Sequence, residues 1–215
     1  MTNLNLSAQD NIFDPNISRP VTLIGAGSVG SVVAVVIAKM GVPQITVYDH
    51  DYVESHNIPM SAYGLNDLGI SKVQALKRII KNQTGAEIKA IEKKYTNQRL
   101  SGTIIACVDD MEERKSIYNS IRNNVLVDLF IDTRVSAEYV SIFAIEPCKP
   151  EDVDFYEYYL RYATSEANLV NCGCHGAIFI SMKIAGTVGG NLTNFWQNGK
   201  KERHYRELCV SLQRV

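Results

Sequence analysis

A glycine-rich turn between two apolar segments is the feature that most constrains the fold of this chain. Residues 21–24 (VTLI) form an apolar run that predicts a strand buried on both faces. Residues 28–40 are too long and apolar for a strand and predict a buried helix. Between them, Gly25, Gly27 and Gly30 form a G-x-G-x-x-G motif. In that setting the first glycine permits a tight turn, the second lets the backbone approach phosphate, and the third lets the helix pack on the strand.

Asp49 supplies an acid at the position where such a motif requires one. It ends the next predicted strand, about 20 residues after Gly30, where a carboxylate accepts hydrogen bonds from ribose hydroxyls. Ser28 lies in the glycine turn, where the free N–H groups and the positive end of the helix dipole attract an anion. Together these residues predict an adenine nucleotide; the alternative is a tight glycine turn without a ligand. The motif alone does not separate NAD from ATP.

Strand-like and helix-like segments alternate along the chain. The further predicted strands are 44–49, 87–92, 103–108, 125–131 and 139–145. The further predicted helices are the segment from Ser71 to Gly85, 111–123 and 176–196. Because such alternation builds βαβ units, we expect an α/β, Rossmann-like fold. Its sheet would be mostly parallel, with helices on both faces and later strands that are partly antiparallel.

Three segments lie outside this alternation. Residues 1–19 are polar and predict a loose lead-in or a short helix, and residues 197–215 form a polar, mildly basic tail. Residues 147–171 carry two prolines and five acids without a strong helical period, and predict a long surface crossover. We expect residues 20–215 to form a single nucleotide-binding domain. The aromatic residues of the crossover predict either a helix face packed on the sheet or a docking surface for a peptide tail: Phe155, Tyr156, Tyr158, Tyr159 and Tyr162.

The composition argues against several classes of protein. Lys and Arg number 22 against 23 Asp and Glu, whereas a general nucleic-acid binder needs a basic surface. No apolar stretch reaches the length of about 18 residues that a transmembrane helix needs. The first residues have neither the basic start nor the apolar segment of a secretory signal. We therefore expect a cytoplasmic protein that binds neither nucleic acid nor membrane.

Four short segments follow the glycine turn in a fixed order. They are residues 49–53 (DHDYV), 55–58 (SHNI), 69–72 (GISK) and 108–114 (VDDMEER). In type and order they resemble motifs of the ThiF family, the adenylating enzymes that activate ubiquitin-like proteins and sulfur carriers. The family's patterns are Asp-x-Asp-x-Val, Ser-Asn-Leu-x-Arg-Gln, Gly-x-x-Lys and Thr-Asp-Asn-x-x-x-Arg. The resemblance covers about residues 20–145, and residues 172–176 resemble the family's Cys-x-x-x-Gly.

The resemblance implies that several of these residues bind ATP. Asp49 would hold the ribose, and Ser28 and Asp51 would lie beside the nucleotide. Asn57 and Lys72 would contact the phosphates, Lys72 as a point charge on their oxygens. For Lys72 the alternative is a solvated lysine at the start of a helix.

The resemblance implies that Asp109 binds Mg²⁺. A carboxylate suits a hard cation that is bridged to phosphate. Asp109 follows a predicted strand, and the carboxyl ends of strands in open α/β sheets border the ligand crevice. The alternative is a helix N-cap, a role that does not exclude metal binding.

Met60 departs from the family pattern, because it stands where the arginine that clamps phosphate is expected. Losing one such donor typically costs about 10²–10³ in rate. Either another cation substitutes, or the site binds nucleotide without efficient turnover. The candidates for substitution are Arg134, to which we assign a catalytic role, Arg19, and an arginine of a second subunit.

The resemblance therefore implies an ATP- and Mg²⁺-dependent adenylyltransferase. Its substrate would be the C-terminal carboxylate of a small ubiquitin-like or sulfur-carrier protein, and its products an acyl-adenylate and pyrophosphate. A homodimer is implied as well. The alternatives are a catalytically weak or inactive member that acts as a partner subunit, and an NAD-dependent oxidoreductase.

Overall fold

A seven-stranded sheet forms the centre of the computed structural model, which describes residues 4–135, 139–166 and 177–209, without the side chains of 162–166. The strand order is β3-β2-β1-β4-β5-β6-β7, and the first five strands pair in parallel. β6 and β7 are antiparallel to their neighbours. The strands are β1 Val21–Ile24, β2 Ile45–Asp49, β3 Lys89–Glu92, β4 Gly102–Ala106, β5 Val127–Val135, β6 Tyr139–Ile145 and β7 His204–Leu208. The expected Rossmann-like α/β fold is thereby confirmed.

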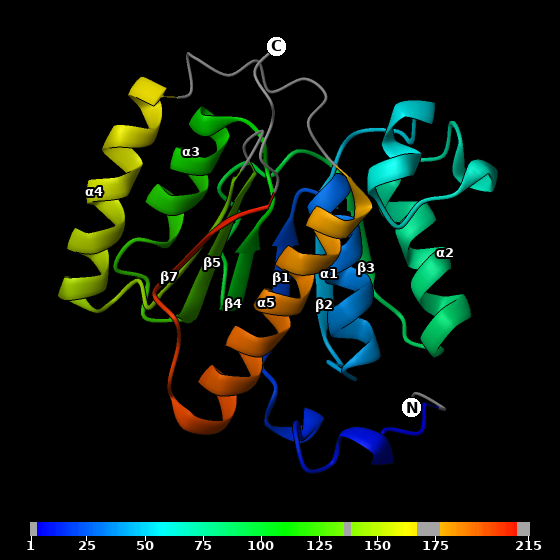
Figure 1. Ribbon diagram of the computed structural model, residues 1–215, viewed down its shortest axis with the longest axis horizontal. Coiled ribbons are helices and arrows are strands. Elements are labelled where there is room, and N and C mark those ends of the chain that lie inside the picture. The colour runs from blue at the N-terminus through cyan, green and yellow to red at the C-terminus, as the bar shows by residue number, and fades with distance from the viewer. Residues whose placement is uncertain (1–3, 136–138, 167–176, 210–215) are drawn as a thin grey trace.

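Helices cover both faces of the sheet (Figure 1). α1 Ser28–Lys39, α2 Lys72–Thr84 and α5 Ile178–Asn198 contribute apolar side chains to one buried core. α3 Met111–Ile121 and α4 Pro150–Glu166 contribute to a second core on the other face. α1 packs closely along α5, because both are rich in small and β-branched apolar residues. In the described part of the chain, no helix has the length and apolar character needed to span a membrane.

The segment expected to be a surface crossover is instead largely helical. α4 covers residues 150–166 and places Tyr156 in the second core, fully buried. Phe143 of β6 meets the rings of Tyr156 and Tyr159, with ring centroids 5.7 and 5.3 Å apart. The helix-face interpretation is therefore confirmed for Phe155, Tyr156 and Tyr159, whereas Tyr158 points outward with 56% exposure and the side chain of Tyr162 lies outside the described part of the chain. The periodicity is weak because acidic residues alternate with these rings around the helix.

The two ends of the chain are also more ordered than their polar sequences predict. The lead-in forms two short 3₁₀ helices, Ser7–Gln9 and Pro15–Ile17, and buries Phe13 against Trp196 of α5. In the tail, β7 pairs with β6 and closes one edge of the sheet. Both elements depend on partners far away in the sequence, so local propensity does not reveal them.

Candidate functional site

The glycine-rich turn joins β1 to α1, and two of its glycines are required by backbone contacts. Gly25 has a φ of +93°, and a Cβ there would lie 2.6 Å from the carbonyl oxygen of Cys107. A Cβ on Gly30 would lie 1.9 Å from the carbonyl oxygen of Gly25. Around Gly27, no atom of the described residues lies within 4 Å of a Cβ position. The turn therefore packs tightly on its strand side and leaves open space beside Gly27, where Ser28 begins α1.

Asp49 ends β2 and fixes the shape of this turn. Its Oδ2 accepts the backbone N–H of Ala26 at 2.6 Å, and its Oδ1 accepts the N–H of Asp51 at 2.8 Å. The side chain is buried, so these bonds replace those that water would make. Asp49 thus holds the loops after β1 and β2 together, a role that the sequence pattern did not indicate. Its contact with a ribose stays a prediction.

Tyr63 ties the glycine turn to the start of α2. Its hydroxyl donates to the carbonyl oxygen of Ala26 at 2.6 Å and lies 3.3 Å from the carbonyl oxygen of Lys72. The ring is buried, and burial, together with the charges of Asp49 and Asp67, raises the pKa of Tyr63 well above its ordinary value. Sequence reasoning missed this residue, because the stretch between β2 and α2 has no period that marks a buried position.

We expect Tyr63→Phe to lower the free energy of unfolding by about 1–3 kcal/mol, because the buried carbonyl of Ala26 loses its partner. Urea denaturation followed by circular dichroism measures the loss. Tyr52→Phe is the matched control, since the Tyr52 hydroxyl bonds to Glu92 at an exposed position. Equal midpoints for the two variants would show that Tyr63 does not hold the turn to α2.

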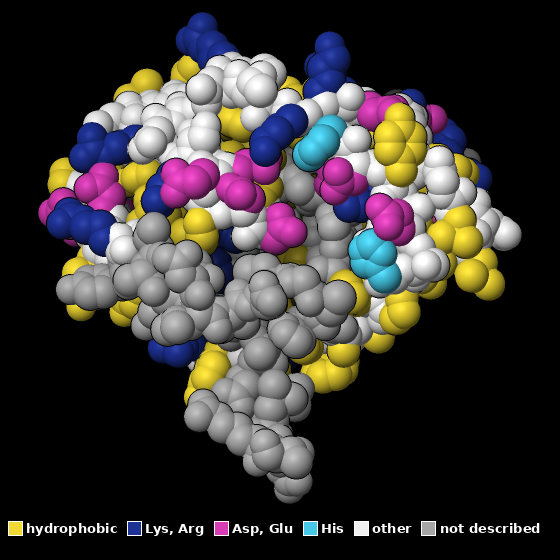
Figure 2. All heavy atoms as spheres, turned by 90° about the horizontal axis from the view of Figure 1, so that it is seen from above, with side chains coloured by type: hydrophobic (Ala, Val, Ile, Leu, Met, Phe, Trp, Pro, Cys, Tyr) yellow, Lys and Arg dark blue, Asp and Glu magenta, His cyan; other side chains and the backbone are white. Residues whose placement is uncertain are grey.

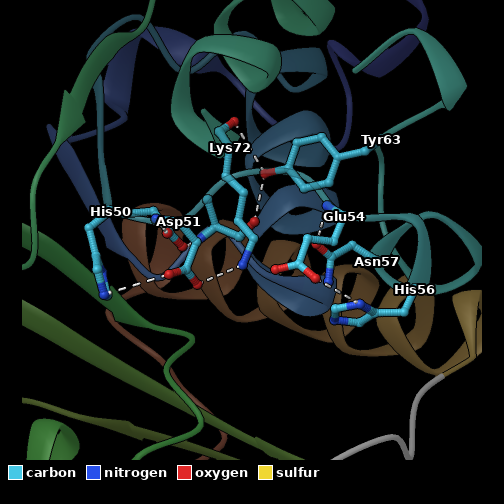
Figure 3. A network of polar contacts seen from close by, with 9 residues as sticks. His50, Asp51, Glu54, His56, Asn57, Tyr63 and Lys72 are labelled. Carbon is cyan, nitrogen blue, oxygen red and sulfur yellow. Dashed lines mark hydrogen bonds and ion pairs between the residues drawn. The ribbon is translucent and has the colours of Figure 1, made fainter. Parts of the chain in front are cut away.

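Lys72 begins α2 beside the glycine turn, and its side chain points toward Asp51 (Figure 3). Its Nζ lies 2.8 Å from Asp51 Oδ2, and only 10% of the side chain is exposed. This burial excludes a solvated lysine. Burial acts to raise the pKa of Asp51, but the hydrogen bond and charge of Lys72 outweigh it, so that this pKa lies below its ordinary value. The site therefore holds a buried ammonium group balanced by a carboxylate that is half exposed.

Asn57 lies in η3, the 3₁₀ helix Ser55–Met60, next to the same site (Figure 3). Its Oδ1 accepts the backbone N–H of Glu54 at 2.9 Å. This bond caps the short helix and orients the side chain, so the amide NH₂ is the group that can donate to a ligand. The predicted phosphate contact of Asn57 is compatible with this orientation.

Asp109 follows β4 and is exposed at the carboxyl edge of the sheet. The N-cap of α3 is its neighbour Asp110, whose Oδ1 accepts the N–H of Glu113 at 2.7 Å. The N-cap alternative for Asp109 is therefore wrong, and its carboxylate is not used in the cap. Figure 2 views this edge from above and shows acidic side chains and histidines near its centre, with lysines and arginines among and around them.

Neither arginine proposed to replace the missing clamp joins Lys72. Arg19 pairs with Asp128 at 2.9 Å. Arg19 precedes β1 and Asp128 begins β5, so the pair lies at the amino ends of these strands, opposite to the edge that carries Lys72. Arg134, near the end of β5, bonds to the buried Asp132 at 2.7 Å. The expectation that Arg19 clamps phosphate is thus wrong, and Arg134 lies two strands away from the glycine turn.

Comparison with known proteins decides the family. The model of the ThiF family matches residues 11–202, which is most of the chain. The chain belongs to the ThiF family. The resemblance to this family is thereby confirmed; residues 172–176 fall within the match, but they lie outside the residues that the structure describes.

Curated relatives match a little over half of this ThiF-family chain. Ubiquitin-like modifier-activating enzyme 5 of Culex quinquefasciatus is 28% identical over 142 residues, 57% of this chain and 35% of the relative. The enzyme of the same name from Caenorhabditis elegans is 28% identical over 151 residues, 61% of this chain and 36% of the relative. The chain thus spans about a third of the length of these relatives.

Solved structures share the fold at low identity. PaaA superposes with a TM-score of 0.71 and 15% identity, over 93% of this chain and 63% of PaaA. Escherichia coli MccB, solved with ATP, has a TM-score of 0.64 and 14% identity, over 90% of this chain and 59% of MccB. The likeness confirms the ThiF-like arrangement of strands and helices.

Met60, the departure from the ThiF pattern, ends η3 beside α5. Its carbonyl oxygen accepts the hydroxyl of Ser181 at 2.9 Å, so the backbone there is held by α5. A thioether offers no charge to a phosphate. In the described part of the chain, Lys72 is therefore the buried cation beside the glycine turn.

Proposed function

We propose that this protein catalyses the ATP-dependent adenylation of a polypeptide carboxylate. The observation that carries the proposal is the buried ammonium of Lys72, which pairs with Asp51 beside the glycine turn, while the Tyr63 hydroxyl lies against the backbone carbonyl of Lys72. The first N–H groups of α1 have no partner inside the helix, and the open space at Gly27 lies next to them. An anion in that space would meet both the N–H groups and the lysine. The names of the relatives, and the ATP in the MccB structure, support this choice of anion.

In the proposed reaction, an oxygen of the substrate carboxylate attacks the α-phosphorus of ATP. A new carboxyl oxygen–phosphorus bond forms, the bond from that phosphorus to the bridging oxygen of the β-phosphate breaks, and pyrophosphate leaves with the electron pair. Lys72 and Asn57 would donate to phosphate oxygens as negative charge shifts toward the leaving group. Asp49 would keep the turn in position during this step. No nucleophile of the protein is needed, because positioning and charge neutralisation perform the chemistry.

Mg²⁺ fits the residues at this edge of the sheet, where it would neutralise phosphate charge. Asp109 offers an exposed carboxylate that no helix cap occupies. Asp49, His50 and Asp51 bring further potential ligand atoms within 4.8 Å of one another. A triphosphate would approach these acids only with its charge partly balanced. We therefore assign the metal to Asp109 and expect nucleotide binding to require it.

The proposed substrate is the C-terminal carboxylate of a small ubiquitin-like or sulfur-carrier protein. The curated relatives are named as ubiquitin-like modifier-activating enzymes, and MccB has been solved with the MccA peptide. We also propose a homodimer located in the cytoplasm. Light scattering during gel filtration tests the dimer, because it gives the molar mass directly.

Calorimetry and isotope exchange test the function together. We expect ATP to bind with Mg²⁺ and to lose at least tenfold in affinity when EDTA replaces the metal, with NAD binding more weakly. We then expect ATP–pyrophosphate exchange when small proteins with a C-terminal glycine, encoded beside this gene, are added. Absence of heat with Mg·ATP would refute the proposal. Binding without exchange would favour the inactive partner subunit, the alternative that Met60 supports.

A further inference from the structure

A strip of two arginines crosses the last three strands of the sheet. Arg134 of β5 pairs in register with Ser141 of β6, which pairs with Arg206 of β7. Directly paired residues of antiparallel strands point to the same face, so these side chains share the face that α4 covers. Neighbouring strands are about 4.8 Å apart, so the two arginine backbones lie about 10 Å apart. We call these three residues the arginine strip.

Each arginine of the strip lies over an aromatic ring of β6. The Arg134 guanidinium is 4.5 Å from the ring centroid of Phe143, and the Arg206 guanidinium is 4.7 Å from that of Tyr139. A guanidinium that lies over a ring keeps its N–H groups at its edge, where a carboxylate binds in a forked geometry. The rings therefore hold both arginines in place, and the exposed Arg206 is the one whose donors face solvent.

Among the described residues, the strip carries more positive than negative charge. Asp132 is fully buried and shared by Arg114 and Arg134, so one carboxylate serves two guanidinium groups. Within the described residues, Arg134 Nη2 is buried without a hydrogen-bond partner. Glu207, the neighbour of Arg206 in the sequence, pairs with Lys183.

His204 precedes Arg206 by two residues on β7, pairs with Phe143, and lies close enough to both arginines to be affected by their charge. Its ring stacks on Phe143 with centroids 4.3 Å apart. Burial, followed by the charges of Arg206 and Arg134, lowers the pKa of His204 below its ordinary value. The two arginines therefore add to burial in disfavouring a positive charge on this ring.

The strip is accessible from one end. Arg206 is exposed, Ser141 is half buried, and 16% of the Arg134 side chain is exposed. Leu208 and Tyr139, the next pair across β7 and β6, are 47% and 37% exposed. An extended chain could lie along this surface with its acidic groups against the arginines.

We propose that the arginine strip binds acidic side chains of the polypeptide substrate, a few residues before the carboxylate that is adenylated. The inference rests on the proposed function for its choice of ligand. β5 and β7 lie two and four strands from the glycine turn, or about 10–19 Å. At about 3.3 Å per residue, an extended tail covers that distance in about three to six residues. The strip thus selects tails that carry Asp or Glu in that interval.

Two labelled peptides test this inference without ATP. One is a fluorescein-labelled decapeptide with four glutamates before a C-terminal Gly-Gly, and the other has four glutamines in their place. We expect fluorescence anisotropy to show binding of the glutamate peptide at least fivefold tighter than that of the glutamine peptide. Arg206→Gln should remove most of this difference, whereas Arg99→Gln, an equal change of charge at an exposed loop residue, should preserve it.

Three outcomes would overturn the inference. They are equal affinities for the two peptides, no binding of the glutamate peptide at about 1 mM, and an unchanged preference in Arg206→Gln. Circular dichroism of this variant establishes that it is folded. Because no nucleotide is present, failure here is distinct from failure of the proposed function, which Mg·ATP calorimetry measures. If the protein discriminates between the two peptides but does not bind ATP, the inference about the arginine strip stands and only the proposed adenylation is refuted.

Discussion

Replacing Lys72 with methionine should weaken Mg·ATP binding by about 10–100-fold, because hydrogen bonds to charged groups contribute about 1.5–3 kcal/mol. Methionine keeps most of the length and apolar character of the lysine stem, so packing at the start of α2 is retained. Isothermal titration calorimetry measures the affinity. In the exchange assay, the loss should reach about 10²–10³, since the ammonium would also stabilise charge in the transition state.

Lys77→Met is the matched control for this variant. Lys77 lies on the same helix with 45% of its side chain exposed, and its Nζ is 3.8 Å from Glu87. We expect its affinity for Mg·ATP to equal that of the wild type. If Lys72→Met and Lys77→Met bound the nucleotide equally well, the phosphates would not lie at Lys72 and the proposed site would be wrong.

Asp132→Asn should lower the free energy of unfolding by about 3–5 kcal/mol, because it leaves two buried guanidinium groups without their anion. Arg114 and Arg134 both bond to this carboxylate, and Tyr156 donates to it at 2.9 Å. Because asparagine has nearly the same shape as aspartate, the loss of stability would come from the missing charge and not from a cavity. Urea denaturation gives the change in midpoint at constant slope.

The effect of Asp132 should depend on pH. Burial acts to raise the pKa of Asp132, but the charges of Arg114 and Arg134 lower it below its ordinary value. The unfolded chain therefore takes up this proton first, at about pH 4, and the stabilisation is lost as the pH falls further. Below that pH, the difference in the free energy of unfolding between the wild type and Asp132→Asn should become smaller. Asp154→Asn, a change at an exposed position of α4, is the control and should have the urea midpoint of the wild type. A wild-type midpoint for Asp132→Asn would contradict this account.

The nucleotide half of the site could be predicted from the sequence because its signals are local. The glycines report backbone conformations that other residues disfavour, and Gly25 and Gly30 show the required contacts. Asp49 ends β2 and Lys72 begins α2, and the parallel topology brings these two element ends to one edge of the sheet. The glycine motif and its spacing indicated Asp49, and the resemblance to the family indicated Lys72.

The substrate half could not be predicted, because its contacts join segments far apart in the sequence. Arg134 was identified as a cation, but its bond to Asp132 and its place over Phe143 depend on the pairing of β5 with β6. The partner of Arg134 in the strip, Arg206, lies in a polar tail with no strand signal. Tyr63 likewise acts on Ala26 through a fold-dependent contact. Propensity carries no information about such long-range pairs.

The position of β7 has a consequence for the order in which the molecule assembles. Ribosomes release the amino-terminal part of a chain first, and β7 emerges after the other six strands of the sheet. The region that surrounds the glycine turn can collapse while synthesis continues, whereas the edge next to β6 stays open until His204–Leu208 arrives. A nascent chain stopped before β7 would thus possess the nucleotide crevice but lack the surface that reads an acidic tail.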